Sequence, residues 1–247
     1  MSLLLRAVTR TDLGLRRETN EDDAYAGPGL VAVADGVGGL PAGELASEAA
    51  IATLSSLDGA VPEGDALAHL RCTVDAASAR IAELVAEDPA LTGMGTTLTA
   101  MWLVDDRIAM VHIGDSRGYL HRGGELSQIT RDDSYVQMLL DSGAITPEQA
   151  RVHPQRSLVS QVLQARPAQP TYTLMRPDPG DRLLLCSDGL SDVVTDEQIG
   201  QVLRDHPDPD ECAAELVKLA LAAGGPDNVT VVLAEVVEAP AETPVAA

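Results

Sequence analysis

One stretch of the chain, residues 31–39, joins a short apolar run to an acid and three glycines. Val31 and Val33 alternate with alanines, which is a pattern typical of a buried strand. Asp35 ends the run, and the glycines around it allow a tight turn whose carbonyls stay open to a ligand. The stretch therefore predicts a strand that leads into a site, although an acid before glycine more often only forms a turn.

The same local setting recurs, because four acids stand where an apolar run meets a glycine-bearing turn: Asp35, Asp115, Asp188 and Asp227. Strand ends of one sheet layer converge in space, so we expect these carboxylates in one pocket. Carboxylates within about 6 Å of one another cannot all stay ionised unless cations neutralise them. Hard divalent ions prefer such oxygen ligands, and the carbonyl of Gly36 can add one more. No cluster of histidines and cysteines indicates zinc.

Two such ions, bridged by one carboxylate, can lower the pKa of a shared water and hold it as hydroxide for in-line attack on phosphorus. The predicted reaction class is therefore phosphoester hydrolysis. Arg17 would add a planar fork for two phosphate oxygens. The alternative for Arg17 is an ordinary surface ion pair.

The composition limits the partners. The formal charge is −21, so a phosphate backbone would be repelled and nucleic acid is not expected as a partner. Cys72, Cys186 and Cys212 lack CxxC spacing and are interpreted as reduced packing residues of a cytoplasmic protein. No stretch approaches the about 18 apolar residues of a membrane span, so no membrane partner is expected. We expect a monomer, because no apolar helix face is left spare.

Hydrophobic periodicity predicts the order of the elements. A long helix is indicated by an apolar stripe of Leu67, Leu70, Val74, Ala77, Ile81 and Leu84. Further helices are expected at 43–57, 195–204 and 209–223, and strands at 3–9, 31–35, 96–104, 107–113, 118–121, 171–175, 182–186 and 229–237. The acidic run 16–23 is expected to be a solvated loop.

The chain is expected to form one catalytic domain over residues 1–237. Within it, residues 131–169 change to polar helices and Pro-bearing loops, which predicts an insertion over one edge of the core. Residues 238–247 are rich in Ala, Pro and Glu and are expected to be a disordered tail.

Seven motifs follow one another over about residues 5–237: RETNED, ADGVGG, GTT, GDSR, ITRDDS, SDGLSD and GGPDNVT. In this order they resemble the bacterial PPM (type 2C) metal-dependent protein phosphatases. The resemblance implies an α+β fold, a four-layer α-β-β-α sandwich with two central antiparallel sheets and the metal site at one end of the sheets. It also implies Mn²⁺ or Mg²⁺ as cofactor, with phosphoserine or phosphothreonine of proteins as substrate.

The resemblance assigns metal ligands. Asp35 resembles the carboxylate that bridges two metals, and Gly36 resembles the residue whose carbonyl binds the first. Asp188 and Asp227 resemble ligands of the second metal. Asp115, together with Asp188, resembles the pair that holds a weaker third metal in bacterial members.

Other positions are expected to support this site. Arg17 resembles the arginine that binds the phosphate, and Glu21 resembles the acid that orders metal-bound water. Asp22 and Asn228 lie in the same motifs, and we expect them to act behind the ligands rather than on a metal. His153 falls in an HPxR segment of the insertion, which corresponds to the mobile flap of the family. A contact of His153 with substrate is predicted, and a helix-capping or exposed histidine is the alternative.

One departure from the family pattern is Leu40. Many relatives carry a histidine directly after the DGxGG turn, proposed to protonate the leaving alkoxide. Its loss would cost about 10²-fold in rate, unless a metal-bound water donates the proton. Leu40 therefore motivates an alternative hypothesis, a weakly active regulator that binds phosphoproteins.

A third hypothesis keeps the metal chemistry on a phosphodiester or a small phosphate ester. Because every metal acid of the family pattern is retained, the main hypothesis is catalysis. It predicts a cytoplasmic hydrolase of signalling, a serine/threonine protein phosphatase that acts on the substrates of Ser/Thr kinases.

Overall fold

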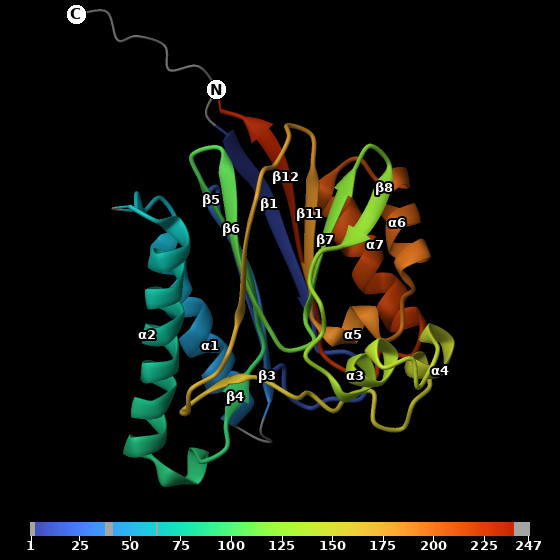
Figure 1. Ribbon diagram of the computed structural model, residues 1–247. Helices are drawn as coiled ribbons and strands as arrows, with labels where there is room; N and C mark the ends of the chain where they lie inside the picture. The colour runs from blue at the N-terminus through green and yellow to red at the C-terminus, as the bar shows by residue number, and fades with distance from the viewer. Residues whose placement is uncertain (1–2, 38–41, 63, 240–247) are drawn as a thin grey trace, which may run out of the picture.

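The computed structural model describes residues 3–37, 42–62 and 64–239. In these ranges two antiparallel sheets stack face to face (Figure 1). One has five strands, in the order β1 (Leu3–Asp12), β12 (Val229–Glu238), β11 (Arg182–Cys186), β7 (Arg117–Arg122) and β8 (Glu125–Gln128). The other has seven strands, with β10 (Thr171–Met175), β6 (Arg107–Ile113), β5 (Leu98–Val104), β3 (Leu30–Val37), β4 (Gly95–Thr96) and β9 (Leu163–Gln164) in order and β2 (Asp22–Ala26) beside β3.

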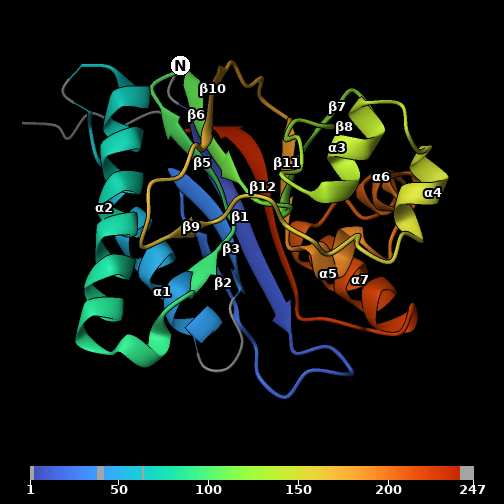
Figure 2. The same cartoon turned by 60° about the horizontal axis from the view of Figure 1, so that its bottom comes forward.

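Helices cover the outer faces of both sheets (Figures 1 and 2). The seven-stranded sheet is covered by α1 (Ala42–Leu54) and α2 (Ala66–Glu87), and the five-stranded sheet by α6 (Asp196–Asp205) and α7 (Pro209–Ala222). Three shorter helices lie at one end of the sheets: α3 (Tyr135–Asp141), α4 (Pro147–Arg151) and α5 (Asp188–Ser191). The expected four-layer α+β sandwich is confirmed.

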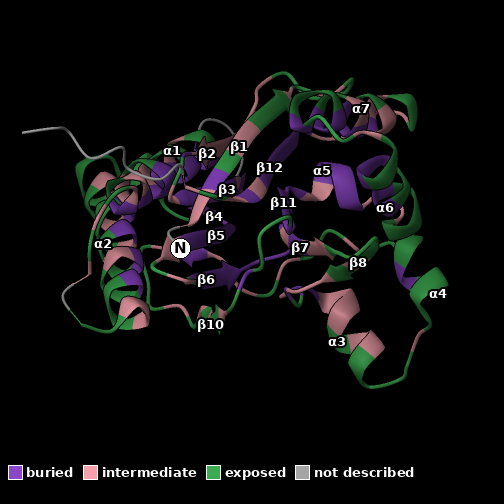
Figure 3. Ribbon diagram, turned by 90° about the horizontal axis from the view of Figure 1, so that it is seen from above, coloured by how far each residue is buried: buried purple, intermediate pink, exposed green. Residues whose placement is uncertain are grey.

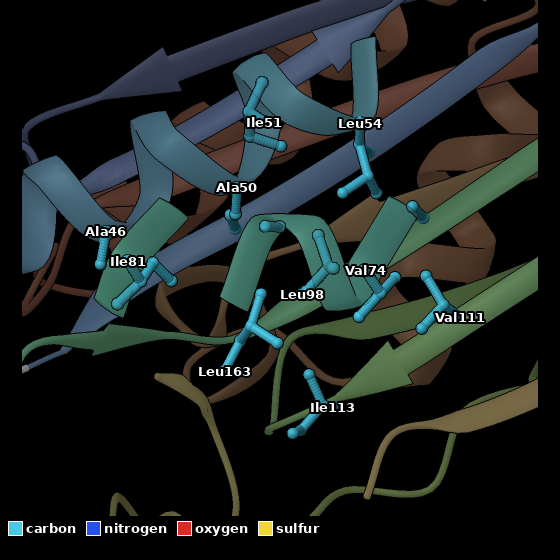
Figure 4. Packing of buried hydrophobic residues seen from close by; sticks show 14 of the residues in the cluster. Ala46, Ala50, Ile51, Leu54, Val74, Ile81, Leu98, Val111, Ile113 and Leu163 are labelled. Carbon is cyan, nitrogen blue, oxygen red and sulfur yellow. The ribbon is translucent and has the colours of Figure 1, made fainter. Parts of the chain in front are cut away.

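Three apolar clusters separate these four layers. One lies between α1, α2 and the seven-stranded sheet (Figure 4), one lies between the other sheet and its helices, and the third fills the space between the sheets. Alanines such as Ala46 and Ala50 let α1 approach β3 closely. Each fully buried Leu or Ile contributes about 1.5–3 kcal/mol, so these clusters hold the strand ends in fixed positions. Figure 3 shows the buried interior and the exposed helix faces.

Most predicted elements are present. The stripe of the long helix packs onto the core as expected, and a turn at Asp105, with φ of 55°, joins β5 to β6. Two of the cysteines, Cys186 and Cys212, are buried, as expected of packing residues, whereas Cys72 is exposed on α2. None of the helices in the described ranges is both long and apolar enough to cross a bilayer.

Three details differ from expectation. The run expected as a solvated loop continues into β2, whose first residue, Asp22, pairs with Asp35. Strand β3 extends to Val37, so that Asp35 lies within the strand and not after it. Glu238, expected in a disordered tail, is the last residue of β12, and residues 240–247 lie outside the described ranges.

Candidate metal and phosphate site

An acidic cleft of about 490 Å³ opens where strands of both sheets end. Its wall contains all four predicted acids, and its lining residues are Arg16, Arg17, Glu18, Thr19, Glu21, Asp35, Gly36, Val37, Asp115, Ser157, Val159, Asp188 and Asp227. We call this space the acidic cleft. It brings together residues that are up to 211 positions apart in the chain, as between Arg16 and Asp227.

The fold delivers each acid to the cleft from a different element. Asp35 comes from β3, Asp115 follows β6, Asp188 opens α5 directly behind β11, and Asp227 precedes β12. The strands β3, β6 and β11 end and β12 begins at the same end of the sandwich (Figure 1). The four acids therefore line one space.

Two threonines of the GTT motif fix the backbone of Asp35. The Asp35 N–H donates to Thr97 Oγ1 at 2.9 Å, and Thr96 Oγ1 donates to the Asp35 carbonyl at 3.0 Å. Thr97 Oγ1 also lies 2.7 Å from Ser116 Oγ, beside Asp115. Thr97 therefore links two of the acids, a role that the motif alone did not indicate.

Glycine is required at two points of the wall because other backbone lies too close for a side chain. A Cβ at Gly36 would lie 2.3 Å from the carbonyl oxygen of Gly43, and a Cβ at Gly189 would lie 1.8 Å from that of Asn228. Glycines therefore lie beside these acids for two reasons: turns need them, and neighbouring chain segments pass too close to leave space for a side chain.

Asn228 joins the Asp227 turn to the loop that carries Arg17. Its Oδ1 accepts from the Glu21 N–H at 2.9 Å, and its Nδ2 donates to the carbonyls of Leu13 at 3.0 Å and Thr19 at 2.9 Å. The loop is thereby held at both ends.

Asp22 lies behind the cleft wall. Its Oδ2 accepts from the Ser187 hydroxyl at 2.7 Å, and its Oδ1 is buried with no hydrogen-bond partner among the described residues. Burial raises the pKa of Asp22 to about 6, and the hydrogen bond from Ser187 opposes that rise. An unsatisfied buried carboxylate oxygen costs free energy, so this atom is suited to a further donor such as an ordered water.

The carboxylates of the cleft repel one another. Burial, followed by the nearby Asp22 and Asp188, raises the pKa of Asp35 well above its ordinary value. Burial and the carboxylate of Asp115 do the same for the pKa of Asp188. The pKa of Asp115 rises to about 7 through burial and the charges of Asp132 and Asp192. A concentration of negative charge this strong calls for cations.

One cation of the protein is already present. Arg17 Nη2 lies 2.6 Å from Asp227 Oδ2, and this hydrogen bond is the main cause that raises the pKa of Arg17. Arg16 and Arg17 both line the cleft, and two guanidinium groups cannot balance its four aspartates and two glutamates, so the remaining charge suits divalent ions. In the described ranges no group of three or more His, Cys, Asp or Glu side chains is already arranged as a metal-binding cluster. The donors that line the cleft are carboxylate and carbonyl oxygens, which suit ions such as Mg²⁺ that also keep several waters.

Two predicted positions need separate mention. His153 does not line the acidic cleft: its Nδ1 accepts from the Gln155 N–H at 3.1 Å, and its ring centroid lies 5.9 Å from that of Tyr135. This hydrogen bond lies in the turn that follows α4, which ends at Arg151, and a substrate contact of His153 stays a prediction. Leu40 lies outside the described residues.

Sequence reasoning missed the neighbouring cavity of about 190 Å³, which shares Asp115 and Asp188 with the cleft and lies against α3 and α4. In its wall Arg117 forms a bidentate pair with buried Asp132, at 3.1 Å from Nε to Oδ1 and 2.8 Å from Nη2 to Oδ2. The GDSR and ITRDDS motifs contain both residues, but their spacing did not reveal the pairing.

A four-layer sandwich with an acidic cleft at one end of its sheets is the architecture expected of the phosphatases whose motifs the sequence carries. Residues 14–219 match the family described as protein phosphatase 2C. The chain belongs to the protein phosphatase 2C family.

Similar proteins come from several bacteria. The chain is 54% identical over 238 residues to the serine/threonine protein phosphatase PstP of Mycobacterium tuberculosis, covering 96% of this chain and 46% of PstP. It thus spans about half the length of that relative. It is 36% identical to the protein phosphatase PhpP of Streptococcus pneumoniae, covering 94% of this chain and 98% of PhpP.

A solved structure is also similar. The catalytic domain of PstP in complex with 2 manganese ions superposes with a TM-score of 0.91 at 52% identity, covering 96% of this chain and 100% of that one.

Proposed function

We propose that this chain hydrolyses phosphoserine and phosphothreonine in proteins at a site that holds two Mn²⁺ or Mg²⁺ ions, with a weaker third. The observation that carries the proposal is the meeting of Asp35, Asp115, Asp188 and Asp227 with Arg17 in the acidic cleft. The two manganese ions of the similar PstP domain support the choice of metal.

We assign the roles as follows. Asp35 and Gly36 would hold the first ion, Asp35, Asp188 and Asp227 would hold the second, and Asp115 with Asp188 would hold the third. When bound, the ions supply Lewis acidity and an activated water.

The chain's own residues prepare the site for that chemistry. Thr96 and Thr97 hold the backbone of Asp35, so the point from which its side chain extends into the cleft is fixed. Arg17 at the cleft wall can turn its planar N–H fork to two phosphate oxygens. Glu21, whose pKa burial raises, can accept a hydrogen bond from ordered water, and Asp22 can do so from behind the wall.

The test is hydrolysis of p-nitrophenyl phosphate and of a phosphothreonine peptide with Mn²⁺. Asp35→Asn should lower kcat/KM by about 10²-fold or more, because an amide cannot neutralise two ions. The control is Asp105→Asn, an exposed turn position whose φ of 55° asparagine tolerates. No turnover by the wild type, or equal turnover by Asp35→Asn, refutes the proposal.

Leu40 supports a second candidate, a weakly active regulator that binds phosphoproteins. Tight binding of a phosphopeptide with negligible hydrolysis in the same assay would favour it. We also propose substrates of Ser/Thr kinases as partners, a monomeric state and a cytoplasmic location. The charge of −21 argues against polynucleotide substrates.

A further inference from the structure

Two hollows continue from the acidic cleft along the loop 157–170. The first, of about 370 Å³, is lined by residues between 159 and 168, and the second, of about 300 Å³, lies between this loop and α2. Val159 lines both the acidic cleft and the first hollow. The residues that line both hollows are Gln164, Arg166, Pro167 and Ala168. We call the two hollows together the docking trough.

A sheet edge runs along the docking trough. Leu163 and Gln164 of β9 pair with Thr96 and Gly95 of β4, and within the described ranges no strand pairs with the other edge of β9 (Figure 2). The buried Leu163 side chain packs into the cluster beneath α2, which holds this edge in place (Figure 4). An open edge of this kind offers backbone donors and acceptors to an extended peptide.

The far wall of the docking trough leaves room for side chains. On α2 it consists largely of small residues, Ser78, Ala79 and Ala82, with Asp75 further along. Their small side chains leave space in the hollow for the side chains of a bound peptide. Asp75, in contrast, would repel an acidic side chain placed beside it. An acidic side chain is therefore expected nearer to the cleft than to Asp75.

The charged residues that line the docking trough are Arg166 and Asp75. The chain carries 38 acidic and 17 basic residues, yet Arg166 is exposed and forms no ion pair with any described residue. An unpaired guanidinium on an acidic surface attracts a negatively charged partner and helps to set its register.

We propose that the docking trough binds an extended segment of the phosphoprotein substrate on one side of the phosphorylated residue, and that Arg166 selects an acidic side chain in that segment. The inference rests on the proposed function, because it assumes that the phosphate occupies the acidic cleft. It names the substrate class more closely: phosphorylation sites in extended, acidic sequence.

The test uses two series of phosphothreonine peptides of equal length. In the first series a single aspartate occupies each flanking position in turn. In the second series a lysine, which has the opposite charge, replaces the aspartate at the same position. For the wild type, aspartate at one or two positions on one side should raise kcat/KM over lysine. Arg166→Glu should shrink that ratio about fivefold or invert it, and the effect should fade at high salt. The control is Arg107→Glu. Arg107 is an exposed arginine at the start of β6, the end of that strand away from the acidic cleft, so its replacement should leave the ratio of kcat/KM for aspartate and lysine peptides unchanged.

A second variant tests the shape of the docking trough. Ala79→Trp should fill the second hollow and weaken binding of the preferred peptide, measured by fluorescence anisotropy, several-fold more than Ala76→Trp, an exposed position of α2 outside the trough. Equal peptide ratios in wild type and Arg166→Glu, or equal binding by the two tryptophan variants, would overturn the proposal. If the wild type hydrolysed neither p-nitrophenyl phosphate nor any peptide, the proposed function would fail instead, while the anisotropy comparison would still decide on the trough.

Discussion

Arg17 and Asp227 form an ion pair in the acidic cleft, with 2.6 Å between Nη2 and Oδ2. The residue proposed to bind the substrate phosphate is thus the partner of a proposed metal ligand, 210 positions away. A cation that binds Asp227 competes with this guanidinium. Metal loading is therefore expected to release Arg17 toward the phosphate.

Removal of the Arg17 charge should affect metal and substrate in opposite directions. In Arg17→Met we expect Mn²⁺ affinity to rise about fivefold, because a competing positive charge is lost. We expect kcat/KM for a phosphopeptide to fall about 10²-fold, because the phosphate loses its fork. Calorimetry measures the first and steady-state kinetics the second. Arg17→Lys keeps the charge and is the control, with metal affinity near that of wild type. A metal affinity that is the same in all three proteins would contradict the competition.

Stability of the metal-free protein should depend on pH through Asp115. The folded protein raises the pKa of this carboxyl to about 7, so it holds a proton that the unfolded chain releases near its ordinary value of 3.8. Where the native state binds more protons, stability falls as pH rises. The contribution of Asp115 is therefore complete below about pH 4 and is lost as pH rises through about 7.

Melting curves at pH 5.5 and 8 without metal test this dependence. The fall in Tm between them should be smaller in Asp115→Asn than in wild type, because the amide does not titrate. Mn²⁺ should restore more stability at pH 8 than at pH 5.5, because cations and protons compete for the same oxygens. An identical pH dependence in wild type and variant would contradict the assignment.

Much of the acidic cleft was predictable because its acids share a local signal. In the sequence, Asp35, Asp115, Asp188 and Asp227 each stand where an apolar run meets a glycine-bearing turn, and strand ends of a sandwich converge. The helices were predictable for a similar reason: apolar residues that recur at helical spacing, as in α2, form one stripe, and this stripe must be buried against the core.

Contacts across the chain were not predictable in this way. Strand β2 was missed because the acidic run before it reads as solvent-exposed, whereas its pairing with β3 depends on the backbone and not on side-chain pattern. The pair of Arg117 with Asp132 joins two polar motifs that spacing alone cannot connect. Asn228 appeared only as a neighbour of Asp227, because its three hydrogen bonds reach backbone atoms more than 200 positions away.

Gly189→Ala should damage both stability and metal binding. Its Cβ would lie 1.8 Å from the Asn228 carbonyl oxygen, so α5 and the start of β12 must move apart. We expect a loss of about 3 kcal/mol in unfolding free energy and a clear loss of Mn²⁺ affinity, since Asp188 and Asp227 flank this contact. Gly200→Ala in α6 is the matched control: its Cβ would lie 3.2 Å from the flexible end of Arg204 and in ordinary contact with Leu126 at 3.5 Å, and helix propensity favours alanine. Denaturant unfolding and calorimetry report the two effects, and equal behaviour of the two variants would refute the close-contact explanation.

Asn228→Ala should release the loop that carries Arg17. The change removes three hydrogen bonds, at about 1 kcal/mol each, so unfolding free energy should fall by about 2–3 kcal/mol. With the loop less fixed, KM for a phosphopeptide should rise more than kcat falls, because Arg17 is positioned by this loop and acts on the substrate phosphate. Gln201→Ala, which removes an exposed amide that donates to Asp205, should change stability by less than about 0.5 kcal/mol and leave KM unchanged. Asn228→Asp keeps the acceptor for the Glu21 N–H but loses both donors, so it should resemble alanine more than wild type. If instead Asn228→Asp matched the wild type in KM, the two donors to Leu13 and Thr19 would not be what holds the loop.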